Sequence, residues 1–163
     1  MAFDRHTLIG GALVGVIAIA CIAGLLITGG PGEARKQKED AARLTAVSET
    51  AVALACYHQA HGSIPADTAQ VESEFADAAS ASRRVKGCAS ARFENDAVTG
   101  EPFHLRRDDT GTVTQICAEF ATSKSIGGRV RYGSAMAIVP DLREARETPG
   151  EHCFALNLDA DLD

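Results

Sequence analysis

The chain has 163 residues, and its 16 basic against 22 acidic side chains give a formal net charge of −6. This acidic balance argues against nucleic acid as a partner. Only 5% of the residues are aromatic and none is tryptophan, so a core must be built from alanine, valine, leucine and isoleucine. A small core of that kind usually needs reinforcement.

Residues 8–28 read LIGGALVGVIAIACIAGLLIT and contain no charged side chain. A helix of this length covers about 31 Å, close to the ~30 Å hydrocarbon core of a bilayer. The stretch predicts one transmembrane helix, preceded by a short N-terminal tail, 1–7. A cleaved signal peptide and a lipid anchor at Cys21 are the alternatives, but the apolar run is longer than a secretory h-region and stays apolar after that cysteine.

Two glycines of this segment, Gly11 and Gly15, lie four residues apart. Such spacing lets two membrane helices approach closely, so a homo-oligomer through Gly11 and Gly15 is one expected partnership. We also expect contacts with the membrane and with other membrane proteins. The competing interpretation is that small residues are simply common in membrane helices.

Residues 29–32, Gly-Gly-Pro-Gly, predict a joint between the membrane helix and a single soluble domain, 33–158. Residues 33–61 then carry apolar side chains at spacings of three and four, which predicts a long amphipathic helix that ends at Gly62. The stripe consists of Leu44, Val47, Ala51, Leu54, Ala55 and His58.

The rest of the domain predicts a second helix at 65–81 and then an antiparallel sheet. The strand candidates are 92–94, 102–107, 112–121 and 152–158. A long connection occupies 122–150, and an acidic tail, 159–163, is expected to fray. The predicted fold class is α+β: an N-terminal transmembrane helix, and a long amphipathic helix packed on a small antiparallel sheet of three to four strands.

Four cysteines, Cys56, Cys88, Cys117 and Cys153, fall in the predicted soluble domain, and none forms a CxxC motif. Four cysteines allow three pairings, and sequence order favours Cys56–Cys88 with Cys117–Cys153. Each bond would close a loop of a little over 30 residues, which is worth roughly 3–4 kcal/mol. The alternative is four reduced thiols in a cytosolic domain.

The charges that flank the predicted span give conflicting evidence on topology. Arg5 precedes the span, whereas four basic residues follow it within residues 35–43, and the positive-inside rule would therefore keep the domain in the cytoplasm. Long domains can translocate regardless of flanking charge, and disulfides require an oxidising compartment. We expect an exported domain on the strength of the cysteines.

The layout of a membrane helix, an amphipathic helix and an antiparallel meander with a disulfide near the C-terminus resembles that of type IV pilins and the pseudopilins of type II secretion. The soluble part also carries four short motifs: His61-Gly62-Ser63-Ile64-Pro65, Asp96-x-x-Thr99-Gly100-x-Pro102-Phe103, Cys117-Ala118-x-Phe120 and Cys153-Phe154. With these landmarks, about residues 40–158 look like a group of uncharacterised bacterial single-pass membrane proteins.

This resemblance implies a bacterial single-pass membrane protein and supplies no catalytic residue. Together with the cysteines it predicts a place in the bacterial inner membrane with the C-terminal domain in the periplasm. No cofactor is expected, because the sequence carries no recognisable cofactor motif. The chain departs from pilins in two respects. It has no prepilin-peptidase site, since no acidic residue lies within the apolar stretch, and the joint at 29–32 interrupts the helix that pilins keep continuous.

The leading hypothesis is a non-catalytic, membrane-anchored periplasmic accessory or assembly subunit of an envelope complex. A metal- or thiol-dependent periplasmic factor is the first alternative, because His58 and His61 can share a helix face beside Cys56, with Cys88 or His152 as a further ligand. The basic run before Cys88 also favours a reactive thiol there. A pilin-like filament component is the second alternative.

Overall fold

The computed structural model describes residues 14–20, 23–24, 30–123 and 132–162. The chain forms two compact units, residues 1–36 and 37–163. Most of the predicted span lies outside the described residues, as do Gly11 and Cys21, while 14–20 and 23–24 are helical. Among the described residues no helix has the length and apolar character needed to cross a membrane.

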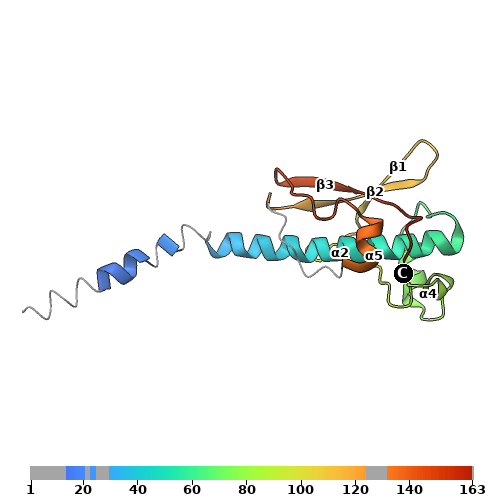
Figure 1. Ribbon diagram of the computed structural model, residues 1–163, viewed down its shortest axis with the longest axis horizontal. Helices are drawn as coiled ribbons and strands as arrows, with labels where there is room; N and C mark the ends of the chain where they lie inside the picture. The colour runs from blue at the N-terminus through green and yellow to red at the C-terminus, as the bar shows by residue number, and fades with distance from the viewer. Residues whose placement is uncertain (1–13, 21–22, 25–29, 124–131, 163) are drawn as a thin grey trace, which may run out of the picture. The chain divides into compact units, whose positions relative to one another are not determined.

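The dominant element of the structure is helix α2, which spans the 31 residues Pro31–His61 (Figure 1). It begins two residues before the predicted start, because proline fits the first helical position, where its missing N–H costs nothing. The helix therefore includes part of the predicted joint. It ends as predicted at Gly62, whose φ is +79° and whose N–H donates to the His58 carbonyl at 2.6 Å.

The apolar stripe predicted along α2 is confirmed: its leucine, valine and alanine members are all 3% exposed or less, and His58 is partly exposed. Burial goes beyond the stripe, because Ala46, Thr50, Ala53 and Cys56 are buried as well. Figure 1 shows the sheet on one side of α2 and the α4 region on the other. Alanines and small polar residues let the chain pack closely around this central helix.

The sheet has three antiparallel strands in the order β1-β2-β3, namely β1 (His104–Arg107), β2 (Val113–Phe120) and β3 (Gly150–Ala155). Its inner face carries the buried side chains of Ile116, Phe120 and Phe154, which belong to the same core cluster as the stripe of α2. The two phenylalanine rings pack edge to face at 6.0 Å. The predicted α+β fold, with a long helix on a small antiparallel sheet, is confirmed.

The second predicted helix, 65–81, is wrong in extent, because two short helices replace it: α3 (Ala69–Ala76) and α4 (Ala81–Arg84). The break between them has a local polar cause. The Asp77 carboxylate accepts the Ala79 N–H at 2.8 Å, and the Ser80 hydroxyl accepts the Arg83 N–H at 3.4 Å. The first bond satisfies a backbone donor outside a helix, and the second caps the N-terminus of α4, where helical structure begins again.

No strand forms at 92–94, so that prediction is wrong. The Thr50 hydroxyl, on α2, donates to the Glu94 carbonyl at 2.5 Å and accepts the Glu94 N–H at 3.0 Å. Both polar groups of that backbone unit are thus paired with a helix side chain, where a strand would pair them with another strand. The predicted 122–150 connection contains a further helix, α5 (Tyr132–Ile138).

The predicted fraying of the C-terminal tail is also wrong for the residues described there. Leu158, Ala160 and Leu162 are buried, whereas the intervening aspartates are exposed. The Gln59 amide donates to the carbonyls of Leu158 at 3.4 Å and Ala160 at 3.0 Å. Beside Gly87 the tail backbone lies so close that a Cβ there would overlap the Leu162 oxygen.

We predict that Gly87→Ala destabilises the domain by about 3 kcal/mol, from left-handed backbone strain and displacement of the tail. The matched control is Gly62→Ala, which has the same backbone strain, at φ +79°, but open space around the new methyl group. It is expected to cost about 1 kcal/mol. Urea unfolding of the full chain in detergent micelles, followed by circular dichroism, measures both. Equal losses would contradict the close packing of the tail.

Candidate functional site

The predicted disulfide pairing is confirmed for both bonds. Cys56–Cys88 links α2 to the loop after α4, with the Cα atoms 5.9 Å apart, and both residues are fully buried. Cys117–Cys153 joins β2 to β3, with the Cα atoms 4.0 Å apart. Because a metal ligand must be a free thiolate, the first bond removes both cysteines of the proposed metal or thiol site.

The two histidines of that proposed site pair with different carboxylates. The His58 Nε2 lies 3.3 Å from the exposed carboxylate of Asp159, and the His61 Nε2 lies 3.3 Å from Glu74 Oε1. Glu74 also accepts the Ser82 N–H at 3.1 Å, and this bond is the main cause of the lowered pKa of its carboxyl group. These histidines fasten the end of α2 to the tail and to α3.

The other candidates from the sequence, Arg83 in α4 and His152 on β3, also serve packing. The Arg83 guanidinium donates to the carbonyls of Phe75 at 2.6 Å and Ala89 at 3.1 Å, so it holds α3 to the loop that carries Cys88. The His152 ring packs against the Phe154 ring at 4.7 Å. The reactive thiol considered for Cys88 is absent in this disulfide-bonded state.

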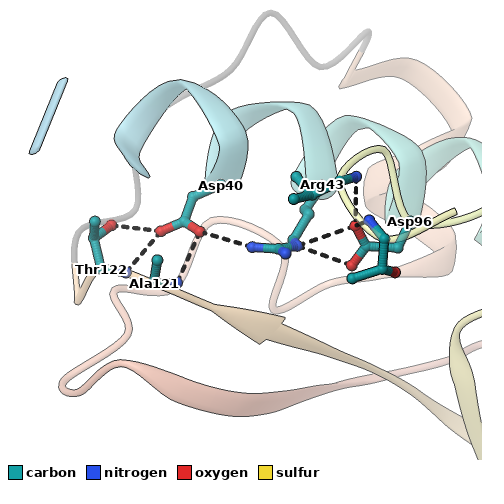
Figure 2. A network of polar contacts seen from close by, with 7 residues as sticks. Asp40, Arg43, Asp96, Ala121 and Thr122 are labelled. Atoms are coloured by element: carbon teal, nitrogen blue, oxygen red, sulfur yellow. Dashed lines mark hydrogen bonds and ion pairs between the residues drawn. The ribbon is translucent and has the colours of Figure 1, made fainter. Parts of the chain in front are cut away.

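A buried network of charged side chains lies along the first core-facing turns of α2 (Figure 2). The Asp40 carboxylate is 2% exposed and accepts three hydrogen bonds just beyond β2: the Ala121 N–H at 2.9 Å, the Thr122 N–H at 2.8 Å and the Thr122 hydroxyl at 2.6 Å. Arg43 Nη1 lies 3.5 Å from the same carboxylate. The network thus fixes α2 to the end of the central strand.

The same arginine connects α2 to the turn that follows Asp96. The Arg43 Nε lies 2.8 and 3.1 Å from the two Asp96 carboxylate oxygens. Asp96 Oδ1 also accepts the N–H groups of Val98 at 2.7 Å and Thr99 at 3.2 Å, which closes the turn. The Asp-x-x-Thr-Gly motif that the sequence marked as a landmark is therefore a structural anchor for Arg43.

A second buried cation completes the charge balance of this region. The Arg146 guanidinium stacks 3.8 Å from the centre of the Phe120 ring. Burial lowers the pKa of Arg146, and the negative charge of Asp40 partly opposes that shift. Two carboxylates and two guanidinium groups thus offset one another in the core, as buried charges must.

Sequence reasoning missed this network, although one signal for it was present. Asp40 stands four residues before Leu44, in register with the apolar stripe of α2, and Arg43 is its neighbour one turn on. A charged residue at a stripe position is a candidate for a paired, buried charge. The pairing residues themselves, near positions 96 and 121, lie too far along the chain to be identified from spacing.

The outer face of the sheet holds a shallow pocket of about 310 Å³. Its lining residues include Glu101, Glu119, Glu151, His104 and Cys117. Glu151 is also held by Arg106, whose Nη2 lies 2.7 Å from its carboxylate oxygen. The pocket therefore brings three glutamates together with Cys117, one of the two cysteines of the Cys117–Cys153 disulfide.

Comparison with known proteins gave no match to any family model, curated protein or solved structure. The function is therefore inferred from the chain's own residues.

We predict that Asp40→Asn costs about 3 kcal/mol of folding free energy, because it removes a buried negative charge that contacts the Arg43 guanidinium and also offsets the charge of Arg146. Glu49→Gln, on the same helix and only partly buried, is the control and should change stability by less than about 0.5 kcal/mol. Urea unfolding of the full chain measures the difference. If Asp40→Asn lowered the free energy of unfolding by no more than Glu49→Gln, the network would not contribute to fixing α2 in the domain.

Proposed function

We propose that this chain is a non-catalytic accessory or assembly subunit of a bacterial envelope complex. Residues 8–28 anchor it in the inner membrane, and the domain that begins at residue 33 lies in the periplasm. The observation that carries the proposal is the joint presence of a long uncharged N-terminal stretch and a domain braced by two disulfides.

The disulfides support the periplasmic side of the proposal. Cys56–Cys88 and Cys117–Cys153 span sequence separations of 32 and 36 residues. Bonds of this kind form and persist in oxidising compartments and are rare in a reducing cytoplasm. They outweigh the basic residues after the span, because a domain of this length can translocate against the positive-inside rule.

The distribution of charge along α2 supports a role in assembly. The side chains of Ala34, Arg35, Lys36 and Lys38 are exposed, whereas burial begins at Asp40. The first turns of the helix thus carry basic side chains on a surface, directly after the predicted span in the sequence. Such a surface is suited to anionic lipid headgroups or to an acidic face of a membrane partner.

A pilin-like filament component is supported by the long helix and the antiparallel sheet alone. The missing prepilin-peptidase site weighs against it, since filament assembly needs that processing. The metal- or thiol-dependent alternative that uses Cys56, His58, His61 and Cys88 has less support, because the two cysteines are bonded to each other and the two histidines contact different carboxylates. We therefore favour the accessory subunit.

The compartment is tested with a thiol reagent that cannot cross the inner membrane, applied to cells whose outer membrane has been permeabilised. We expect none of the four domain cysteines to be labelled before reduction, because all four are disulfide-bonded. A reductant that cannot cross the inner membrane should expose Cys117 and Cys153 to the reagent, whereas the buried Cys56 and Cys88 should need denaturation as well. A variant that keeps only Cys21 is the control and should stay unlabelled in intact cells. Labelling of free thiols that appears only after lysis would place the domain in the cytoplasm.

The partner surface is tested by placing a photo-crosslinking residue at Lys36, which is exposed on α2, with Glu72, exposed on α3, as the matched control. We expect discrete membrane-protein adducts from Lys36 and none from Glu72. An adduct of twice the chain mass of 17.1 kDa indicates a homo-oligomer, and it should disappear in the Gly11→Leu/Gly15→Leu variant. Adducts from neither position would contradict an assembly role for this surface.

A further inference from the structure

One row of side chains on the outer face of the sheet crosses all three strands. His104 on β1 is the register partner of Cys117 on β2, which in turn is the partner of Cys153 on β3. Glu151 lies two residues before Cys153 and so shares its face. The two sulfurs and a carboxylate oxygen of Glu151 all lie within 4.8 Å of one another.

The two disulfides of the chain differ in accessibility. Cys56 and Cys88 are each 0% exposed, so a reductant has no approach to their sulfurs. Cys117 is 2% exposed but lines the outer pocket, and Cys153 is partly exposed. Thiol–disulfide exchange requires direct attack on a sulfur, so a reductant should open the Cys117–Cys153 bond through Cys153 first.

We propose that Cys117–Cys153 is a redox-gated zinc site: after reduction, Cys117, Cys153, Glu151 and His104 bind one Zn²⁺. A dithiol reductant supplies two electrons and two protons, the S–S bond breaks to give two thiols, and the reductant becomes a disulfide. Zn²⁺ then binds as both thiols release their protons to solvent. In the oxidised state the sulfurs are bonded to each other and bind no metal.

The donor set and its spacing fit zinc. Two thiolates, one imidazole nitrogen and one carboxylate oxygen make a mixed tetrahedral set, in which neighbouring donor atoms lie roughly 3–4 Å apart. The Glu151 carboxylate oxygen already lies within 4.8 Å of both sulfurs on the neighbouring strands β2 and β3, and reduction would let the two sulfurs separate around the ion. His104 is exposed on the edge strand β1, is the register partner of Cys117 and lines the same pocket, so the proposal assigns it as the fourth donor.

The charges around the row also favour a cation. Glu119 stands directly opposite Glu151 in the β2–β3 register, and two like charges in that position repel each other. Glu151 is at present balanced by Arg106, but that pair is about half exposed, and such pairs are worth at most about 1 kcal/mol. A bound Zn²⁺ can therefore replace the guanidinium as the partner of the Glu151 carboxylate.

The test uses the full chain in detergent micelles with Cys21→Ser as the background, so that the domain cysteines are the only thiols. After mild reduction, alkylation mapped by mass spectrometry should modify Cys117 and Cys153 and spare Cys56 and Cys88. Titration of the reduced protein with Co²⁺, as a spectroscopic substitute for zinc, should produce a thiolate charge-transfer band that saturates near one equivalent and is displaced by Zn²⁺. The oxidised protein should show no such band.

Variants separate the ligands from their surroundings. Cys117→Ser/Cys153→Ser should abolish the band, and Glu151→Gln and His104→Ala should each weaken zinc binding by about tenfold or more. Glu119→Gln lines the same pocket without being a ligand and should weaken binding far less. The proposal is overturned if the reduced protein gives no thiolate band, if the band survives without Cys117 and Cys153, or if the reduced domain loses its circular dichroism spectrum before metal is added.

Discussion

The burial of α2 on several sides is the constraint on which the rest of the domain depends. A helix that is surrounded in this way cannot leave a charged or hydroxyl side chain unpaired, because an unpaired polar group in the core costs several kcal/mol. Asp40, Arg43 and Thr50 each meet that demand with the backbone or side chains of a distant segment. The polar partners of the helix therefore fix where the sheet end and the turn at Asp96 lie.

The two faces of the sheet carry different kinds of side chain. The inner face is apolar, and its phenylalanines close the core over α2, with Arg146 stacked on Phe120. The outer face carries the Cys117–Cys153 bond among carboxylates and a histidine, beside an open pocket. The inner face and the Cys56–Cys88 bond thus belong to the buried core, whereas the outer face presents polar side chains and the second disulfide at the surface.

For the proposed subunit, the fixed position of α2 within the domain is important. A domain that binds a partner needs a fixed shape. Here α2 is linked to the rest of the domain by the Cys56–Cys88 disulfide near its C-terminal end and by the Asp40–Arg43–Asp96 network nearer its N-terminal end. The exposed basic turns that precede the network lie next in sequence to the apolar stretch. In the proposed function, these turns meet the membrane or a partner while the sheet surface stays available on the periplasmic side.

The sequence by itself determined the elements whose information is local. Periodicity over residues 33–61 predicted α2 and its buried stripe, and cysteine order predicted both disulfides. Alternation predicted the three strands, although the last one was expected at 152–158 and spans Gly150–Ala155. Only the tertiary structure decided what depends on distant partners. Residues 92–94 form no strand, because the Glu94 backbone is hydrogen-bonded to Thr50. The tail does not fray, because it packs beside Gly87. In both cases the contacting residue lies far away in the chain, where spacing and periodicity give no information about it.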